Sequence, residues 1–251
     1  MKKFKFKINH SKNLEEKIFQ KLNDFGFHSI ENAVSQKDLI FLQKIVKNLI
    51  HKNGQRYFTL INPINKEFHF IKEDSEFLSL AQNISERKLG RKIEKNDRLS
   101  VLRVITGNKI SEQSFKFHFD AYILTILVPI NIPNSGKNDG HLILFPNLRK
   151  KTRYSFLNFV EKIFYQNAIT RTIIKFFANF NINKYLIKLK PGNLYFFWGY
   201  QSLHANMPIN RTLLRSTLLL HFGTVHDKSK INNLIKKIRH SREISNTKKK
   251  Y

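Results

Sequence analysis

Apolar residues recur at helical spacing in two stretches of the amino-terminal part of the chain. The first stretch is residues 12–24, KNLEEKIFQKLND, and Gly26 follows it as a C-terminal stop. The second is residues 36–52, which Ser35 precedes as a suitable N-cap and Gly54 follows. Its apolar stripe consists of Leu39, Leu42, Ile45, Val46 and Leu49. We therefore predict one helix over each stretch.

Short apolar runs replace the helical pattern from residue 99 onwards. Upstream of that point, FHSIENAV predicts a short strand entering a turn, and residues 55–98 are mixed and mostly polar, so no element is assigned there. The expected strands lie in LSVLRVIT, SFKFHFDAYILTILVPINI, GHLILFP, YLIKLKPGNLYFFWG and TLLRSTLLLHFG. Gly, Pro and Asn turn signals separate these runs, which favours a β-sandwich or barrel over alternating strands and helices.

The pattern predicts one domain over residues 1–225, with a helical part over 1–98 and a β core over 99–225. An insertion at about 150–185 has helical apolar spacing, so we interpret it as a packed helical extension or a lid over one end of the sheet. Residues 226–251 resemble a basic amphipathic helix with a disordered tip. The expected fold class is therefore mainly β with flanking helices.

Composition excludes several kinds of site. None of the 251 residues is cysteine, which excludes a disulfide scaffold, a thiolate metal site and a cysteine nucleophile, and fits a reducing compartment. The amino terminus lacks the apolar segment of a secretory signal, and the longest apolar run, AYILTILVPINI, is shorter than the ~18 residues of a membrane span. We therefore expect a soluble, cytoplasmic protein with no transmembrane segment.

The formal net charge of +27 would suit a nucleic acid or an anionic membrane as partner. The lysines are spread along the chain, except in the carboxy-terminal tail, and dispersed charge is typical of a solvated surface. Lysine, asparagine, isoleucine and phenylalanine are abundant together, as an AT-rich coding sequence produces for any protein. We therefore do not expect a nucleic-acid partner.

A polar pair interrupts the aromatic run FKFHFD. In a strand, residues two apart point to the same face, so His118 and Asp120 are expected side by side, with Phe115, Phe117 and Phe119 on the opposite face. Such a pair is also compatible with an ion pair on an exposed strand. Evidence for a functional site must therefore come from the rest of the chain.

A second group of polar residues follows in KLKPGNLYFFWGYQSLHANMPINRTLLRST. A buried strand and a turn around Gly199 lead to His204, and Arg215 follows eleven residues later with Thr217 on the same strand face. A buried arginine in an apolar strand needs an anionic partner, because an unpaired buried charge is costly. Its planar fork suits a carboxylate, so a carboxylate ligand beside His204 is the natural inference.

Two histidines and one carboxylate on converging strands form a three-point face that leaves coordination positions open. This arrangement of His118, Asp120 and His204 suits non-haem Fe(II) oxygen chemistry. Zinc binds similar ligands but supplies no redox chemistry. Arg215 favours iron, since it offers an anchor to a carboxylate-bearing cosubstrate. Both histidines must be neutral to bind metal, so iron affinity is expected to decline below their ordinary pKa of about 6.5.

The combination HFD … PGNLYFFWGYQSLHANMPINRTLLRST resembles the Fe(II)/2-oxoglutarate-dependent dioxygenases, over roughly residues 20–225. The segments FGFHSIENAVSQKDLIFLQKIVKNL and DGHLILFPNLRK look like the phytanoyl-CoA dioxygenase-like branch. FPNLRK lacks the Gly-Ser-His element that is usual in that branch, and the helical insertion is also unusual. The resemblance implies a double-stranded β-helix core with a rebuilt substrate pocket.

Carried over by position, the resemblance makes His118, Asp120 and His204 the iron ligands. It makes Arg215 the residue that binds the far carboxylate of 2-oxoglutarate, assisted by the Thr217 hydroxyl. The implied cofactors are Fe(II), 2-oxoglutarate and O2. The implied reaction is hydroxylation of a C–H bond of a small or carrier-linked metabolite, with release of succinate and CO2.

Other polar residues of the strands are weaker candidates for the same site. We interpret His141 and His221 as packed or hydrogen-bonded strand histidines, and no arginine follows His221 at the required distance. Arg103 could meet a substrate or cosubstrate carboxylate, but a structural ion pair is the favoured interpretation.

Other functions of the same fold stay open. A nucleic-acid demethylase would fit the charge, but those enzymes carry a second arginine six residues after the cosubstrate arginine, where this chain has His221. A protein or peptide hydroxylase is a further alternative. A non-catalytic binding protein is another, although retention of all four site residues argues against it.

Overall fold

The computed structural model describes residues 4–8, 11–54, 57–106, 114–133, 140–149, 185–210 and 212–225. The expected helical insertion and the basic carboxy-terminal helix lie outside the described residues, apart from Tyr185. Among the helices of this described part, none is long and apolar enough to span a membrane.

The two predicted helices are confirmed. α1 spans Lys12–Phe25 and α2 spans Gln36–Asn53, each with a serine at its N-cap. The Ser35 hydroxyl accepts a hydrogen bond from the Asp38 amide, which satisfies one of the free N–H groups of the first turn. Gly26 ends α1 at a φ of 77°, a left-handed conformation that glycine adopts without strain.

A third helix lies in the segment to which the sequence assigned no element. α3 spans Ser75–Leu89 and begins at Asp74, whose carboxylate accepts a hydrogen bond from the Phe77 amide. Its apolar residues Phe77, Leu80, Ala81 and Ile84 are buried. Short 3-10 turns flank it at Pro63–Asn65 (η1), His69–Glu73 (η2) and Lys95–Asp97 (η3).

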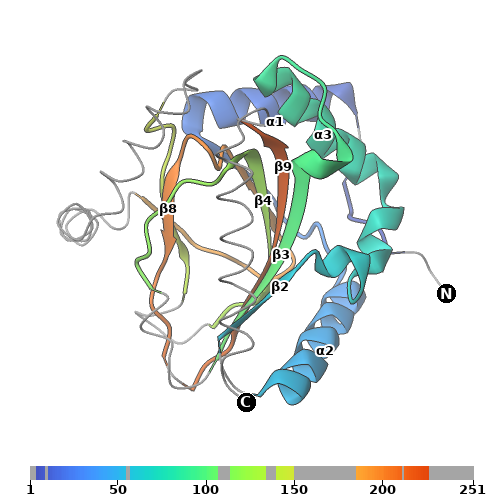
Figure 1. The fold of residues 1–251 in the computed structure, drawn as a ribbon, viewed down its shortest axis with the longest axis vertical. Helices are drawn as coiled ribbons and strands as arrows, with labels where there is room; N and C mark the ends of the chain where they lie inside the picture. Colours follow the sequence, from blue (N-terminus) through green and yellow to red (C-terminus); the bar gives the residue numbers. More distant parts are fainter. Residues whose placement is uncertain are drawn as a thin grey trace.

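Two antiparallel sheets form the β core (Figure 1). The larger sheet contains, in spatial order, β1 (Phe27–Ile30), β7 (Leu194–Phe197), β4 (Tyr122–Asn131), β9 (Arg215–Thr224), β3 (Arg98–Ile105) and β2 (Phe58–Ile61). The smaller sheet contains β6 (Leu186–Ile187), β5 (Leu142–Phe145) and β8 (Leu203–Asn206). The expected class, mainly β with flanking helices, is confirmed.

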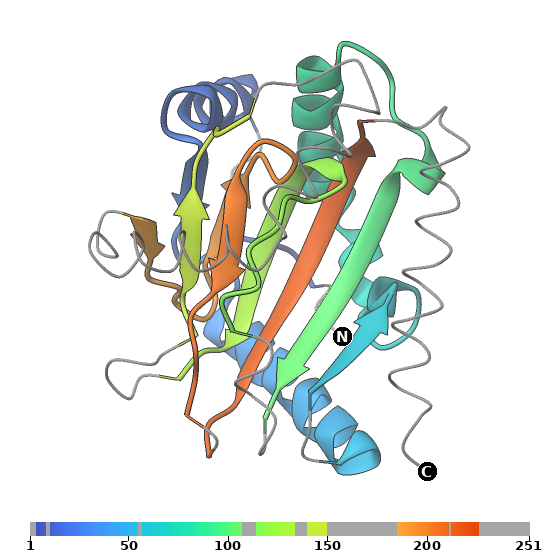
Figure 2. The same cartoon turned by 60° about the vertical axis from the view of Figure 1, so that its left-hand side comes forward.

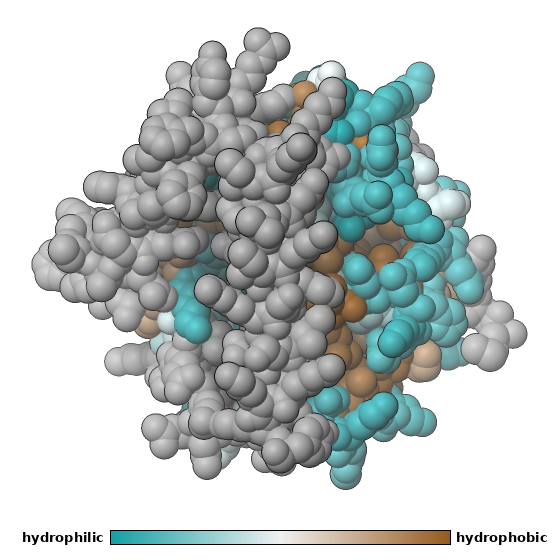
Figure 3. Space-filling model, in the orientation of Figure 1, coloured by the Kyte–Doolittle hydropathy of each residue, from teal (hydrophilic) through white to brown (hydrophobic). Residues whose placement is uncertain are grey.

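The strands β7, β4 and β9 of the larger sheet are buried on both faces. Figure 2 shows the helices behind one face and the smaller sheet in front of the other. In β9, Leu218 and Leu220 belong to the core under the helices, whereas Leu219 belongs to the core between the two sheets. Both environments are apolar, which explains why the sequence of β9 is a nearly continuous apolar run and does not alternate between apolar and polar residues. On the helical side, the coloured surface in Figure 3 is mostly hydrophilic.

The prediction that FKFHFD forms a regular strand is wrong. Residues 114–120 have irregular backbone with one isolated bridge, His118 to His204, and Phe115 has a φ of 53°. Phe117 and Phe119 are nevertheless buried, at 2% exposure each. The segment therefore lies along β8, a strand that the sequence pattern did not reveal, and its aromatic side chains anchor it there.

Candidate metal centre

Three predicted site residues meet at one point. The Nε2 atom of His118 lies 3.7 Å from Asp120 Oδ1, and the Nε2 atom of His204 lies 3.6 Å from the same oxygen. One ligand atom from each of the three residues lies within 4.8 Å of the others. Two imidazoles and a carboxylate on one side leave further coordination positions open, as a non-haem iron site requires.

Backbone hydrogen bonds orient both imidazoles. The His118 Nδ1 atom lies 2.8 Å from the Lys116 carbonyl oxygen, and the His204 Nδ1 atom lies 3.0 Å from the Ser202 carbonyl oxygen. A carbonyl can only accept, so each Nδ1 donates its proton and each Nε2 carries the free lone pair. Metal-binding histidines commonly have this arrangement, which fixes both the tautomer and the ring direction.

Gly199 makes room for the Asp120 carboxylate. The Asp120 amide donates to the Gly199 carbonyl at 2.9 Å. A Cβ atom on Gly199 would lie 2.5 Å from Asp120 Oδ2 and 2.3 Å from Thr125 Oγ1, closer than such atoms can approach. The turn after β7 therefore needs glycine, because its backbone passes directly beside the carboxylate.

The charge state of the three residues suits a divalent cation. Burial, and then the neighbouring His204, lower the pKa of His118 to about 3, against an opposing effect of Asp120. Burial acts to raise the pKa of Asp120, but His204, His221, His118 and the Thr125 hydrogen bond outweigh it and lower this pKa. The site therefore presents neutral His118 beside ionised Asp120. Protonation of His118 does not begin near pH 6.5, as the sequence suggested, but well below it.

The metal-free protein is expected to lose stability as the pH falls from about 6.5 towards 4. Burial lowers the pKa of His221 to about 4 and that of His118 to about 3, whereas the unfolded chain titrates at 6.5. The unfolded state therefore binds protons that the folded state does not, so the free energy of unfolding should fall by on the order of 1 kcal/mol for each pH unit below about 6.5. Urea unfolding in chelator at several pH values measures this slope. His69→Ala, on an exposed turn, should leave it unchanged; a flat wild-type profile would contradict the expectation.

Arg215 is a buried cation without a carboxylate partner among the described residues. Its side chain is 1% exposed and donates to the Gly140 carbonyl at 2.6 Å, Asn206 Oδ1 at 2.8 Å and Thr217 Oγ1 at 3.3 Å. Burial, and then the nearby Arg103, lower its pKa to about 9. Three neutral acceptors leave a charged group of this kind undercompensated, so the cavity beside it suits an anion.

Arg103 lines the same cavity, and the structural ion pair that the sequence favours for it stays a prediction. The structure gives it no ion pair or hydrogen bond with another described side chain, and it pairs across the strands with Thr217. The cavity is lined by Arg103, His118, Asp120, Leu127, Leu142, Phe197, His204, Ala205, Asn206, Arg215, Thr217, Leu219 and His221. All five predicted site residues therefore line one cavity between the two sheets.

Two residues support Asp120: Thr125, which the sequence did not single out, and His221, which it predicted to be a packed or hydrogen-bonded strand histidine. Thr125 donates a hydrogen bond to Asp120 Oδ2 at 2.5 Å, and His221 Nδ1 lies 3.7 Å from the same oxygen. Their signal was available in the sequence, since both are polar residues within otherwise apolar strands. Like His221, His141 fits the role of a hydrogen-bonded strand histidine, since it accepts a hydrogen bond from the Leu189 amide at 3.3 Å.

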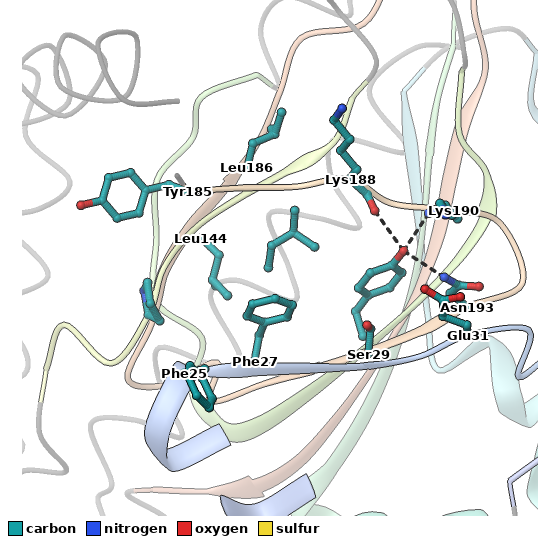
Figure 4. Close-up of a pocket in the computed structure, with 13 residues that line it drawn as sticks. Phe25, Phe27, Ser29, Glu31, Leu144, Tyr185, Leu186, Lys188, Lys190 and Asn193 are labelled. Carbon is teal, nitrogen blue, oxygen red and sulfur yellow. Dashed lines mark hydrogen bonds between the residues drawn. The ribbon is translucent and has the colours of Figure 1, made fainter. Parts of the chain in front are cut away.

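A second cavity of about 510 Å³ lies elsewhere, between the edge strands β1 and β6 (Figure 4). The side chains of Phe27, Leu144 and Tyr195 line it, and the Tyr195 hydroxyl is held by the backbone of Lys188 and Lys190. Apolar residues of the inter-sheet core, including Leu144 and Tyr195, belong to the same cluster as Leu127 and Leu219 of the metal centre's cavity. Members of this cluster therefore line both cavities.

Comparison with known proteins identifies the fold. No protein-family model and no curated protein sequence matches the chain. The structure matches a prolyl hydroxylase from Trichoplax adhaerens, solved with a hypoxia inducible factor peptide, at a TM-score of 0.51 and 18% identity, over 84% of this chain and 90% of that one. A prolyl 4-hydroxylase from Phytophthora capsici matches at 0.55 and 13% identity, over 90% and 70% of the respective chains.

An epimerase shares the fold. The non-haem α-ketoglutarate-dependent epimerase of nogalamycin biosynthesis matches at a TM-score of 0.53 and 10% identity, over 87% of this chain and 86% of that one. Its likeness, with those of the two prolyl hydroxylases, does not single out the phytanoyl-CoA dioxygenase-like branch, which stays a prediction. The chain has the fold of the 2-oxoglutarate/Fe(II) oxygenases, and a His-Asp-His triad able to bind a metal lies between its two sheets.

Proposed function

We propose that this protein is an Fe(II)- and 2-oxoglutarate-dependent dioxygenase that hydroxylates a C–H bond of a small or carrier-linked metabolite, releasing succinate and CO2. One observation carries the proposal. The triad of His118, Asp120 and His204 and the undercompensated Arg215 line the same cavity. A metal site alone would fit many chemistries, but a metal site beside a buried cation favours a carboxylate-bearing cosubstrate.

The donor set fits ferrous iron. Two neutral imidazole nitrogens and one carboxylate oxygen are ligands that Fe(II) accepts, and together they leave positions for a cosubstrate and O2. Bound iron would supply the activation of O2 that C–H hydroxylation needs. The Nδ1 hydrogen bonds of His118 and His204 keep both Nε2 atoms directed to the ion, so little reorganisation accompanies binding.

The charges of the cavity favour a dianion. Arg103 and Arg215 contribute two positive charges, Asp120 contributes one negative charge, and a divalent metal adds two positive charges. 2-Oxoglutarate carries two carboxylates, and in this proposal one binds at the metal and the other at Arg215. Thr217 Oγ1 accepts a hydrogen bond from Arg215 Nη1 at 3.3 Å and so steadies the guanidinium group. In this proposal Arg103 is the second cation that favours the dianion.

Apolar walls complete the cavity. Leu127, Leu142, Phe197 and Leu219 line it, and all four belong to the core between the sheets. Such walls exclude water, which strengthens the electrostatic interactions of Arg215 and protects a reactive oxidant from side reactions.

We further propose a cytoplasmic enzyme whose partner is a small-molecule substrate rather than a nucleic acid. The lack of cysteine fits a reducing compartment. His221 occupies the position where the demethylases of this fold carry a second arginine, and in this structure it contacts Asp120 instead. This contact leaves His221 engaged at the metal centre rather than available to a phosphate backbone.

Anaerobic reconstitution tests the proposal directly. The protein is loaded with Fe(II), given 2-oxoglutarate, and exposed to O2, and succinate is measured with and without candidate substrates. Succinate formation should depend on Fe(II) and stop when Zn(II) replaces it, because zinc supplies no redox chemistry. Failure to bind both Fe(II) and 2-oxoglutarate would show that the assignment is wrong.

A further inference from the structure

We propose that Thr125 and His221 form a positioning pair that holds Asp120 with one carboxylate oxygen facing the metal and the other turned away from it. The inference rests on the metal centre of the proposed function and adds the residues that set its affinity. Neither residue is a ligand in the triad, and both act through Asp120.

The hydrogen bonds run in one direction. The Thr125 hydroxyl donates to Asp120 Oδ2 at 2.5 Å, and Thr125 Oγ1 also lies 3.0 Å from His221 Nδ1. A hydroxyl has one proton, which Asp120 already receives, so His221 Nδ1 must donate to Thr125. The resulting chain is His221 to Thr125 to Asp120, and each donor fixes the orientation of the next group.

The pair is held rigidly by the larger sheet. Thr125 and His221 are direct cross-strand partners on β4 and β9, the two central strands. Thr125 is fully buried and His221 is 6% exposed. The Tyr122 ring stacks on the His221 imidazole with centroids 5.3 Å apart at 26°. Neither side chain can move far without disturbing the sheet, so both can act as a fixed support.

The two oxygens of Asp120 therefore have different surroundings. Oδ1 faces the Nε2 atoms of His118 and His204 at 3.7 and 3.6 Å, whereas Oδ2 faces Thr125 and His221. This division favours coordination through Oδ1 alone. A monodentate carboxylate occupies one coordination position, whereas a bidentate one occupies two. Monodentate binding therefore leaves a position free for the cosubstrate or O2.

Metal affinity measured without turnover tests the pair. Titration of the apo protein with Mn(II), in the absence of 2-oxoglutarate, should show about 10- to 100-fold weaker binding for Thr125→Val, the usual range when a supporting hydrogen bond of a metal ligand is lost. Thr125→Ser keeps the hydroxyl and should restore affinity close to that of the wild type. His221→Phe should give a smaller loss, because Thr125 can still donate to Asp120.

The matched control is Ser216→Ala, which removes a buried hydroxyl on the opposite face of β9, where it bonds Asn131. It should bind Mn(II) as the wild type does. Equal affinity of the wild type and Thr125→Val would overturn the inference while leaving the proposed function intact. No Mn(II) binding by the wild type would instead overturn the metal centre itself. If Thr125→Val does not fold, the comparison of His221→Phe with Ser216→Ala decides the outcome.

Discussion

Replacement of Asp120 by alanine is expected to abolish metal binding and 2-oxoglutarate turnover together. Asp120 Oδ1 is the oxygen that both imidazole nitrogens face, and it provides the negative charge of the triad. Without it, two neutral imidazoles remain beside two arginines, which repel a cation. We expect Fe(II) affinity to fall by more than about 100-fold, beyond the range seen when only a supporting contact is lost.

Binding and activity of this variant should be measured separately. Fe(II) or Mn(II) titration reports the affinity, and succinate release reports the turnover. Asp24→Ala is the matched control, because Asp24 is an exposed aspartate at the end of α1. Wild-type metal affinity in the Asp120 variant would remove this residue from the site and disprove the triad.

Arg215→Met is expected to separate cosubstrate binding from metal binding. The variant loses the buried cation that anchors the far carboxylate, so the KM for 2-oxoglutarate should rise by about 100-fold, the loss of a charge-assisted contact worth about 3 kcal/mol. Metal affinity in the absence of 2-oxoglutarate should not decrease, since Arg215 contacts none of the three ligands in the structure.

The same variant should keep the free energy of unfolding of the apo protein unchanged or raise it. Breaking an ordinary buried ion pair would instead lower it. Arg215 has only neutral partners among the described residues, and replacing an undercompensated charge by an apolar side chain of similar size is often neutral or stabilising. Urea unfolding measures this directly. Arg87→Met, which breaks an exposed pair with Glu16, is the control and should leave the KM unchanged. An unchanged KM in Arg215→Met would exclude Arg215 as the anchor.

The sequence predicted the features that depend on local chemistry. Ser35 and Gly26 mark helix ends because their capping interactions are made within a few residues. The triad could be proposed because a histidine and an aspartate two apart, a second histidine and a later arginine form a pattern that few structural roles require together. The structure shows that the triad and the arginine line one cavity.

The features that the sequence did not predict depend on long-range packing. FKFHFD alternates like a strand, but its backbone follows β8 through one bridge and does not extend a sheet. The pattern of β3 alone cannot show that Arg103 lines the same cavity as Arg215. Thr125 and His221 are far apart in the chain, and only the pairing of β4 with β9 brings them together beside Asp120.

The placement of the triad gives a bound metal a mechanical role. His204 belongs to β8 of the smaller sheet, whereas Asp120 is tied through Thr125 to β4 of the larger sheet. An ion bound by both residues would link the two sheets. The chain contains no cysteine, so a disulfide cannot provide such a link. Loss of iron would then weaken the connection between the two sheets as well as stop the reaction.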